Sequence, residues 1–96
     1  MTSKQRAYLR GLANNIDAIF QIGKGGISDN LIKQLDDALE ARELIKISVL
    51  ETAPDVAKTL GNEIAEKTNS TLVQVVGNKI TLFRQKKKDS KIELPK

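Results

Sequence analysis

The chain has 96 residues, which is enough for one domain and too few for two. It contains no cysteine and no histidine, so disulfides and metal sites built on thiolates or imidazoles are excluded. Residues 1–34 carry five basic and two acidic side chains, residues 35–83 carry five and eight, and residues 84–96 carry six and two. Basic ends around an acidic middle favour contact with a polyanion at the ends, although ordinary solubility would account for the same pattern.

The N-terminal segment is predicted to form a helix over residues 3–14. Thr2 and Gln5 have the spacing of a capping box. Apolar side chains then recur with helical spacing at Tyr8, Leu9, Leu12, Ala13 and Ile16. Arg6 and Arg10 are four residues apart and therefore share one side of this helix. The segment lacks the apolar core of a signal peptide, and no stretch of the chain is long enough to span a bilayer, so we expect a soluble cytoplasmic protein.

The next segment combines a strand, a loop and a helix. Residues 18–22 are rich in β-forming residues and predict a short strand, and three glycines within residues 23–26 make the following segment a loop. Ser28 is a suitable N-cap for a second helix. Its apolar face comprises Leu31, Ile32, Leu35, Ala38 and Leu39. Its outer face carries Asp36, Asp37 and Glu40, which we interpret as a solvated surface because no histidine or cysteine accompanies them.

A second strand and a third helix follow. The strand is predicted over residues 44–50, where apolar and polar side chains alternate. The helix is predicted to begin at Thr52, with Pro54 in its first turn and Asp55 completing a second capping pattern. Its expected apolar stripe comprises Val56, Leu60, Ile64 and Ala65. Gly61 lowers the helix propensity of this segment, unless close packing compensates.

The last part of the chain predicts a hairpin and a tail. Residues 71–76 and 79–84 are rich in β-forming residues and flank Gly77-Asn78, a pair suited to a two-residue turn. From residue 85 onward the sequence is polar and aperiodic. We therefore expect one folded domain over residues 1–84, followed by a flexible basic tail over residues 85–96.

The predicted order of elements is α-β-α-β-α-β-β. Two β-α-β connections favour parallel strands, and the hairpin adds an antiparallel pair. The expected fold class is therefore α/β, with a four-stranded mixed sheet and helices packed on it in two layers or partly in three. The pattern leaves the strand order open, as well as the face that the first helix covers.

The glycine loop is the feature that carries chemistry. Glycines allow a nucleic-acid backbone to approach the peptide closely, and a helix start offers N–H donors to a phosphate. Lys24 adds a cation at the tip of the loop. A Gly-x-x-Gly loop of this kind clamps backbone nucleotides in some RNA-binding modules. A tight turn that requires positive φ would explain the same four residues.

Four separated segments together resemble the CRM domain, and most closely its stand-alone bacterial form, the YhbY-like RNA-binding proteins. They are residues 4–13 (KQRAYLRGLA), 21–26 (QIGKGG), 43–46 (ELIK) and 75–84 (VVGNKITLFR). The resemblance covers residues 2–84 and implies a fold similar to the C-terminal domain of translation initiation factor 3. The family commonly has tyrosine where this chain has Phe83, which keeps the ring and loses the hydroxyl.

The resemblance also implies a function. Bacterial members are associated with precursors of the large ribosomal subunit, and plant organellar relatives act in group II intron splicing. Carried onto this chain, the RNA-binding residues are Gly23, Lys24, Gly25 and Gly26 in the loop, Lys4, Arg6 and Arg10 in the first helix, and Lys46 in the strand. The hypothesis is therefore a ribosome assembly factor that binds ribosomal RNA of the large-subunit precursor by its shape and backbone.

Other interpretations remain. Arg6 and Arg10 could be a solvated helix face, Lys46 an outward strand residue, and the lysines at 86–88 a solubilising tail. A protein-interaction adaptor without RNA contact is the alternative function. An enzyme is not expected, because no nucleophile–base pair is present. We expect a monomer without cofactor, metal, small-molecule substrate or membrane contact.

Overall fold

The computed structural model describes residues 1–95. Its elements in chain order are α1 (Ser3–Ala13), β1 (Phe20–Ile22), α2 (Asp29–Arg42), β2 (Leu44–Val49), α3 (Ala57–Thr68), β3 (Thr71–Val76) and β4 (Lys79–Phe83). The predicted order of elements is confirmed, and most boundaries agree within two residues. The predicted tail has its last residue, Lys96, outside the described part of the chain. No helix within residues 1–95 is both long and apolar enough to cross a membrane.

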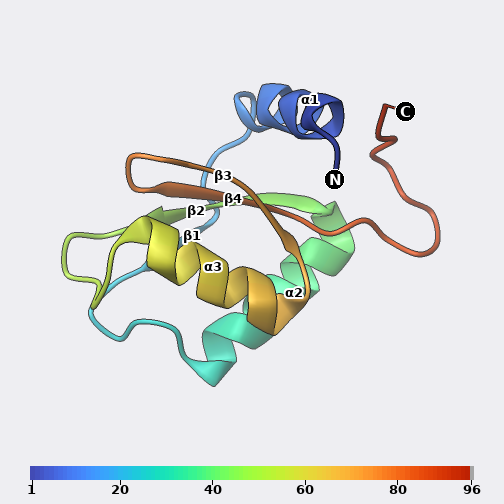
Figure 1. Ribbon diagram of the computed structural model, residues 1–96. Helices are drawn as coiled ribbons and strands as arrows, with labels where there is room; N and C mark the ends of the chain where they lie inside the picture. The colour runs from blue at the N-terminus through green and yellow to red at the C-terminus, as the bar shows by residue number, and fades with distance from the viewer. Residues whose placement is uncertain (96) are drawn as a thin grey trace.

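The four strands form one mixed sheet in the order β1-β2-β4-β3 (Figure 1). β1 and β2 are parallel, with Phe20 opposite Ile47. β4 is antiparallel to both of its neighbours, β2 and β3. The connection from β2 through α3 to β3 therefore links two parallel strands that are not adjacent, and the returning hairpin strand β4 fills the position between them.

Three layers enclose two hydrophobic clusters. Figure 1 shows α1 on one face of the sheet and both α2 and α3 on the other. The larger cluster lies between the sheet and the helices α2 and α3, and it is centred on Leu35, Leu39, Ile45, Ile47, Ile64, Ile80 and Leu82. The smaller cluster lies under α1 and comprises Leu9, Ala13, Leu44, Val73 and Phe83. The Phe83 ring thus serves packing, as expected from the sequence.

The predicted start of the third helix is wrong. α3 begins at Ala57, with Val56 as its N-cap and no side-chain cap, while residues 51–55 form turns. The reason is Pro54, which would occupy the second helical position and disfavours the helical conformation of Ala53 before it. Val56 is 65% exposed and does not belong to the apolar stripe. The buried residues of α3 are Ala57, Leu60, Gly61, Ile64 and Thr68.

Gly61 is explained by close packing between α3 and the sheet. A Cβ at this position would lie 3.1 Å from Leu72 Cδ1 and 3.3 Å from Ile80 Cγ2. These distances are shorter than ordinary van der Waals contact, so the missing side chain lets the helix approach the strands. The low helix propensity of glycine is offset in this way.

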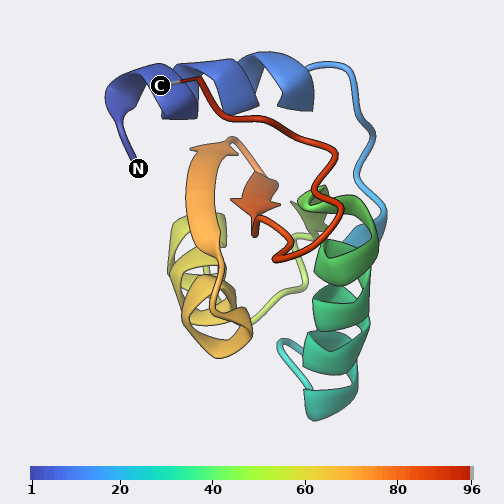
Figure 2. The ribbon, with the colours of Figure 1, turned by 90° about the vertical axis from the view of Figure 1, so that its right-hand side faces the viewer.

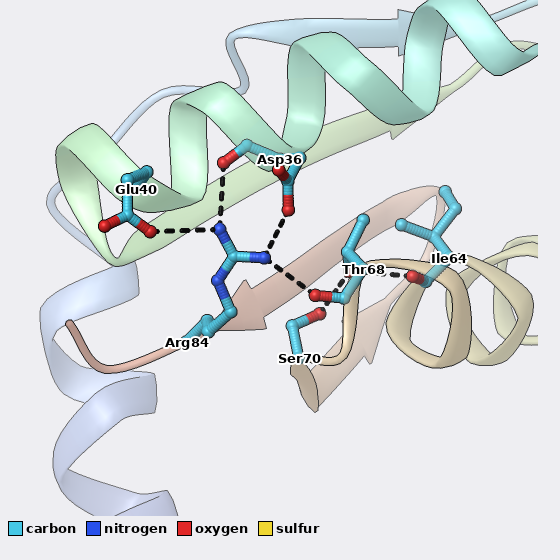
Figure 3. Close-up of polar contacts among 6 residues, drawn as sticks. All are labelled: Asp36, Glu40, Ile64, Thr68, Ser70 and Arg84. Carbon is cyan, nitrogen blue, oxygen red and sulfur yellow. Dashed lines mark hydrogen bonds and ion pairs between the residues drawn. The ribbon is translucent and has the colours of Figure 1, made fainter. Parts of the chain in front are cut away.

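Arg84 joins three elements at the end of β4 (Figure 3). Its guanidinium donates to the carbonyl oxygen of Thr68 at 2.8 Å and to that of Asp36 at 3.0 Å. It also forms ion pairs with the carboxylates of Asp36 and Glu40. Two acidic residues on the outer face of α2 therefore serve to attach the helix to the strand, in keeping with a structural rather than a catalytic interpretation.

Candidate nucleic-acid interface

The glycine segment is a loop, as predicted. The N–H of Gly26 donates to the carbonyl oxygen of Gly23 at 3.0 Å and closes a four-residue turn. Lys24 and Gly25 occupy the two central positions and are exposed. The turn lies at the end of the sheet where β1 and β2 finish, and the hairpin turn reaches the same end, because Asn78 hydrogen-bonds to Val49.

The three glycines of this loop have different structural requirements. Gly26 has φ +64° and lies against Pro54, whose Cγ would be 3.0 Å from an added Cβ. Gly23 would make only ordinary contacts with Leu50 and Thr52. An added Cβ at Gly25 would meet nothing within 4 Å. The turn therefore requires a glycine at position 26, whereas the fold does not require one at position 25.

This difference predicts that two alanine substitutions in the loop have unequal effects on the free energy of unfolding. Gly26→Ala is expected to lower the free energy of unfolding by about 1–2 kcal/mol, because a left-handed conformation strains a residue with a Cβ. Gly25→Ala is expected to leave stability unchanged or slightly raised, because alanine restricts the unfolded chain. Urea denaturation of both variants measures the difference, and equal losses would contradict the assignment.

Ser28 caps α2, as predicted, and the helix start is therefore not part of the glycine turn. Ile27 and Ser28 separate Gly26 from the first helical residue, Asp29. The Ser28 hydroxyl already accepts a hydrogen bond from the N–H of Leu31 at 3.1 Å. The Asp29 carboxylate lies in the first turn, where it opposes the approach of another anion. Lys24 and the exposed turn backbone are thus the groups this loop presents to a phosphate.

Arg6 has a structural partner that the sequence did not indicate. Its guanidinium donates to the carbonyl oxygens of Leu72 and Val73, each at 2.7 Å. These carbonyls lie at an irregularity of β3, between Leu72 and Gln74, where the register with β4 shifts. A bulge leaves backbone groups unpaired, and Arg6 satisfies them while it fixes the N-terminal half of α1 to the sheet.

Arg10 is exposed and lies on the same flank of α1 as Arg6. Gln5, on one flank of α1, lines the same surface hollow as Thr71 and Phe83. Arg6 and Arg10 lie on the other flank, which therefore faces the opposite end of the strands. In Figure 1 the hairpin of β3 and β4 extends beyond α1 at that end.

Two lysines lie on this open half of the sheet. Lys46 of β2 and Lys79 of β4 occupy the face that α1 partly covers, since Leu44 and Phe83 on the same strands pack under α1 and residues two apart share a face. The Lys79 ammonium donates to the Ser48 hydroxyl at 2.5 Å. We call Arg10, Lys46 and Lys79 the basic corner.

The structure brings together only some of the predicted residues. Lys24 and Lys79 lie at the same end of the sheet, and Lys46 lies two residues farther along the strands on the same face as Lys79. Lys4 is exposed in the first turn of α1, on its solvent side. Lys79 was missed, because its place beside Lys46 depends on the pairing of β2 with β4. Within residues 1–95 no cluster of acidic residues could hold a metal ion.

Comparison with known proteins identifies the class of protein to which this fold and loop belong. The chain matches the model of the CRS1 / YhbY (CRM) domain over residues 1–84, and it therefore belongs to this family. The resemblance found in the sequence is confirmed.

Two relatives and one solved structure match over nearly their whole length. The chain is 45% identical over 95 residues to "Probable RNA-binding protein YqeI" of Bacillus subtilis (strain 168), with 99% of each chain covered. It is 28% identical over 96 residues to a Haemophilus influenzae protein named "RNA-binding protein", covering 100% of this chain and 96% of that one. The solution structure of the hypothetical protein SAV1595 from Staphylococcus aureus has a TM-score of 0.83 and 56% identity, with 99% of both chains covered. The predicted α/β fold is confirmed by this neighbour.

Proposed function

We propose that the protein binds RNA through the glycine loop and the basic corner, without catalysing a reaction. The observation that carries the proposal is Gly25, which is exposed and has open space where a side chain would be. It stands next to Lys24 and at the same end of the sheet as Lys79. A glycine that the fold does not need leaves the peptide accessible to a sugar–phosphate backbone. The names of the relatives support RNA as the ligand.

Binding would be mainly electrostatic. The cations of the loop and the basic corner are Lys24, Arg10, Lys46 and Lys79, whereas Arg6 is engaged with backbone carbonyls. Four phosphate contacts correspond to a slope of about −4 when the logarithm of the binding constant is plotted against the logarithm of the salt concentration. The chain has only three aromatic residues, Tyr8, Phe20 and Phe83, so base stacking would contribute little.

The proposed target is ribosomal RNA in the precursor of the large subunit, and the proposed role is in its assembly. Support for this finer statement comes from the family resemblance. Sedimentation of the tagged protein through a sucrose gradient, combined with RNA crosslinking, tests it. A peak at the precursor of the large subunit is expected, whereas crosslinks spread over all cellular RNA would contradict the assembly role and leave RNA binding intact.

The double variant Lys24→Glu/Gly25→Glu is expected to weaken RNA binding at least tenfold while the fold is retained. It places negative charge and bulk in the exposed turn, where a Cβ added at position 25 would meet no atom within 4 Å. Fluorescence anisotropy with a labelled fragment of large-subunit ribosomal RNA measures the affinity at fixed salt.

The matched control for this test is Lys33→Glu/Gln34→Glu. Both residues lie in α2, which covers the face of the sheet opposite to the basic corner, and both are exposed. The control lowers the net charge by three units, as Lys24→Glu/Gly25→Glu does, so it corrects for the lower net charge of the double variant. Equal affinity of the double variant and the control would contradict the proposed site. A partner protein bound independently of salt, without RNA, would favour an adaptor instead.

A further inference from the structure

The segment after β4 is attached to the fold. Residues 85–95 form no helix or strand, in agreement with their aperiodic sequence. The sequence predicted a flexible tail here, whereas the contacts described below attach this segment to the fold. In Figure 2 the segment, drawn in red, leaves the sheet, passes the C-terminal end of α2 and returns alongside α1. The lysines of this segment lie beyond the C-terminal end of β4, which is at the other end of the sheet from the hairpin turn and the glycine loop.

Glu43 is the first attachment point. It lies between α2 and β2 in a backbone conformation with φ +67°, and its side chain is fully buried. One carboxylate oxygen accepts hydrogen bonds from the N–H of Lys86 at 3.0 Å and from the hydroxyl of Ser90 at 2.6 Å. The other accepts from the N–H groups of Lys91 at 2.5 Å and Ile92 at 3.3 Å. One side chain thus ties together both ends of the stretch from residue 86 to residue 92.

Apolar contacts form the second attachment. Ile92 and Leu94 pack against the cluster under α1, which contains Leu9, Leu44 and Phe83. Fixing a segment by a buried, fully hydrogen-bonded carboxylate and by apolar side chains restricts the lysines between these points.

The stretch between the attachments is strongly basic. It contains Lys86, Lys87, Lys88 and Lys91 and a single acid, Asp89. The nearby carboxylates of Asp36 and Glu40 are paired with Arg84. Among residues 1–95 none of the four lysines forms an ion pair, and Lys87, Lys88 and Lys91 are exposed. Their charge is therefore available to an external anion.

We propose that the clasped segment 86–91 is a second phosphate-binding surface for RNA, held in a fixed position by Glu43. This inference rests on the proposed function. β4 separates the surface from the glycine loop, and its five residues span about 16 Å. One RNA would contact both ends of the sheet. Because the segment is ordered before binding, less conformational entropy is lost than with a free polycationic tail.

Three variants test whether the segment binds RNA as a fixed surface or as a flexible basic tail. The triple variant Lys86→Gln/Lys87→Gln/Lys88→Gln removes charge and leaves the attachments in place. The variant Ile92→Ser/Leu94→Ser keeps the charge and removes the apolar attachment. The third protein combines both sets. Amide chemical shifts of Lys91 and Ile92 in NMR spectra report whether the segment is attached, and RNA affinity is measured over a range of salt concentrations.

The triple variant is expected to bind RNA about tenfold more weakly, with a salt slope shallower by about 2–3. The Ile92→Ser/Leu94→Ser variant, which lacks the apolar attachment, is expected to bind RNA more weakly as well, although its charge is unchanged. The combined variant is expected to bind RNA no more weakly than the triple variant. If the Ile92→Ser/Leu94→Ser variant binds RNA like the wild type, the proposal of a fixed surface is wrong. Unchanged affinity of the triple variant, which alters no fully buried residue, would overturn any contact between these lysines and RNA.

The two proposals are distinguishable in the same assay. If Lys24→Glu/Gly25→Glu binds normally while the triple variant binds weakly, the glycine loop is not the site and the clasped segment is. If only Lys24→Glu/Gly25→Glu binds RNA weakly, the glycine loop is the binding site and the clasped segment is not.

Discussion

Replacing Arg84 with methionine is expected to lower the free energy of unfolding by about 2 kcal/mol. The Arg84 guanidinium donates to the carbonyl oxygen of Thr68 in the last turn of α3 (Figure 3). Carbonyls in the last turn of a helix have no N–H partner within the helix. Methionine fills the space of the side chain but donates no hydrogen bond, so this carbonyl loses its partner. Urea denaturation at neutral pH measures the change.

A control variant separates the carbonyl contact from the ion pair with Glu40. The Glu40 carboxylate is 3.4 Å from the Arg84 guanidinium, and its side chain is 71% exposed. Exposed ion pairs contribute about 0–1 kcal/mol. Glu40→Gln is therefore expected to change the free energy of unfolding by less than about 0.5 kcal/mol. A loss as large as that of Arg84→Met would show that the ion pair, and not the Thr68 carbonyl, is the stabilising contact.

Acidification is expected to release the clasped segment and lower the stability of the fold. Burial alone would raise the pKa of the Glu43 carboxyl, but the four hydrogen bonds from the segment hold it below its ordinary value of 4.5. The unfolded chain therefore takes up this proton more readily than the folded one. The contribution of Glu43 is complete above pH 4.5 and is lost as the pH falls through the lower pKa of the folded state. Amide shifts of Lys91 and Ile92 during an acid titration follow the release.

Glu43→Gln is expected to lower the free energy of unfolding by about 2 kcal/mol at pH 7. The amide carries no charge and turns one N–H₂ group toward hydrogen-bond donors of the segment. The variant should also lose this part of the acid dependence. Asp89→Asn removes an exposed carboxyl from the same segment and is the matched control. If both variants have the same stability at pH 7, the clasp does not stabilise the fold.

Local patterns predicted most of the secondary structure correctly. The capping box of Thr2 and Gln5 starts α1, and Ser28 caps α2, because both interactions involve residues only three apart. Gly77-Asn78 forms the hairpin turn for the same reason. The start of α3 was predicted wrongly because two local preferences compete there: the capping pattern at Thr52 favours a helix start, and Pro54 disfavours the helical conformation of Ala53.

The candidate site was predictable only in part. The glycine loop was found because its chemistry lies in four consecutive residues. The pattern did not distinguish Gly25, which the fold does not require, from Gly26, which it does. Arg6 was assigned to RNA on its position in the helix, yet the bulge in β3 takes its hydrogen bonds. Such a partner is 66 residues away in the chain and has no local sequence pattern.

Short-range patterns in this chain were thus sufficient for its class, its elements and its glycine loop, because caps, turns and alternating burial depend on neighbouring residues. Only the tertiary structure determines the strand order, the placement of Lys46 and Lys79 on the same face of the sheet, and the attachment of the lysine-rich segment to Glu43. These depend on contacts between residues about 30 to 50 positions apart. Long-range pairing is selected by burial and hydrogen bonding of the whole molecule, and no window of the sequence contains both partners.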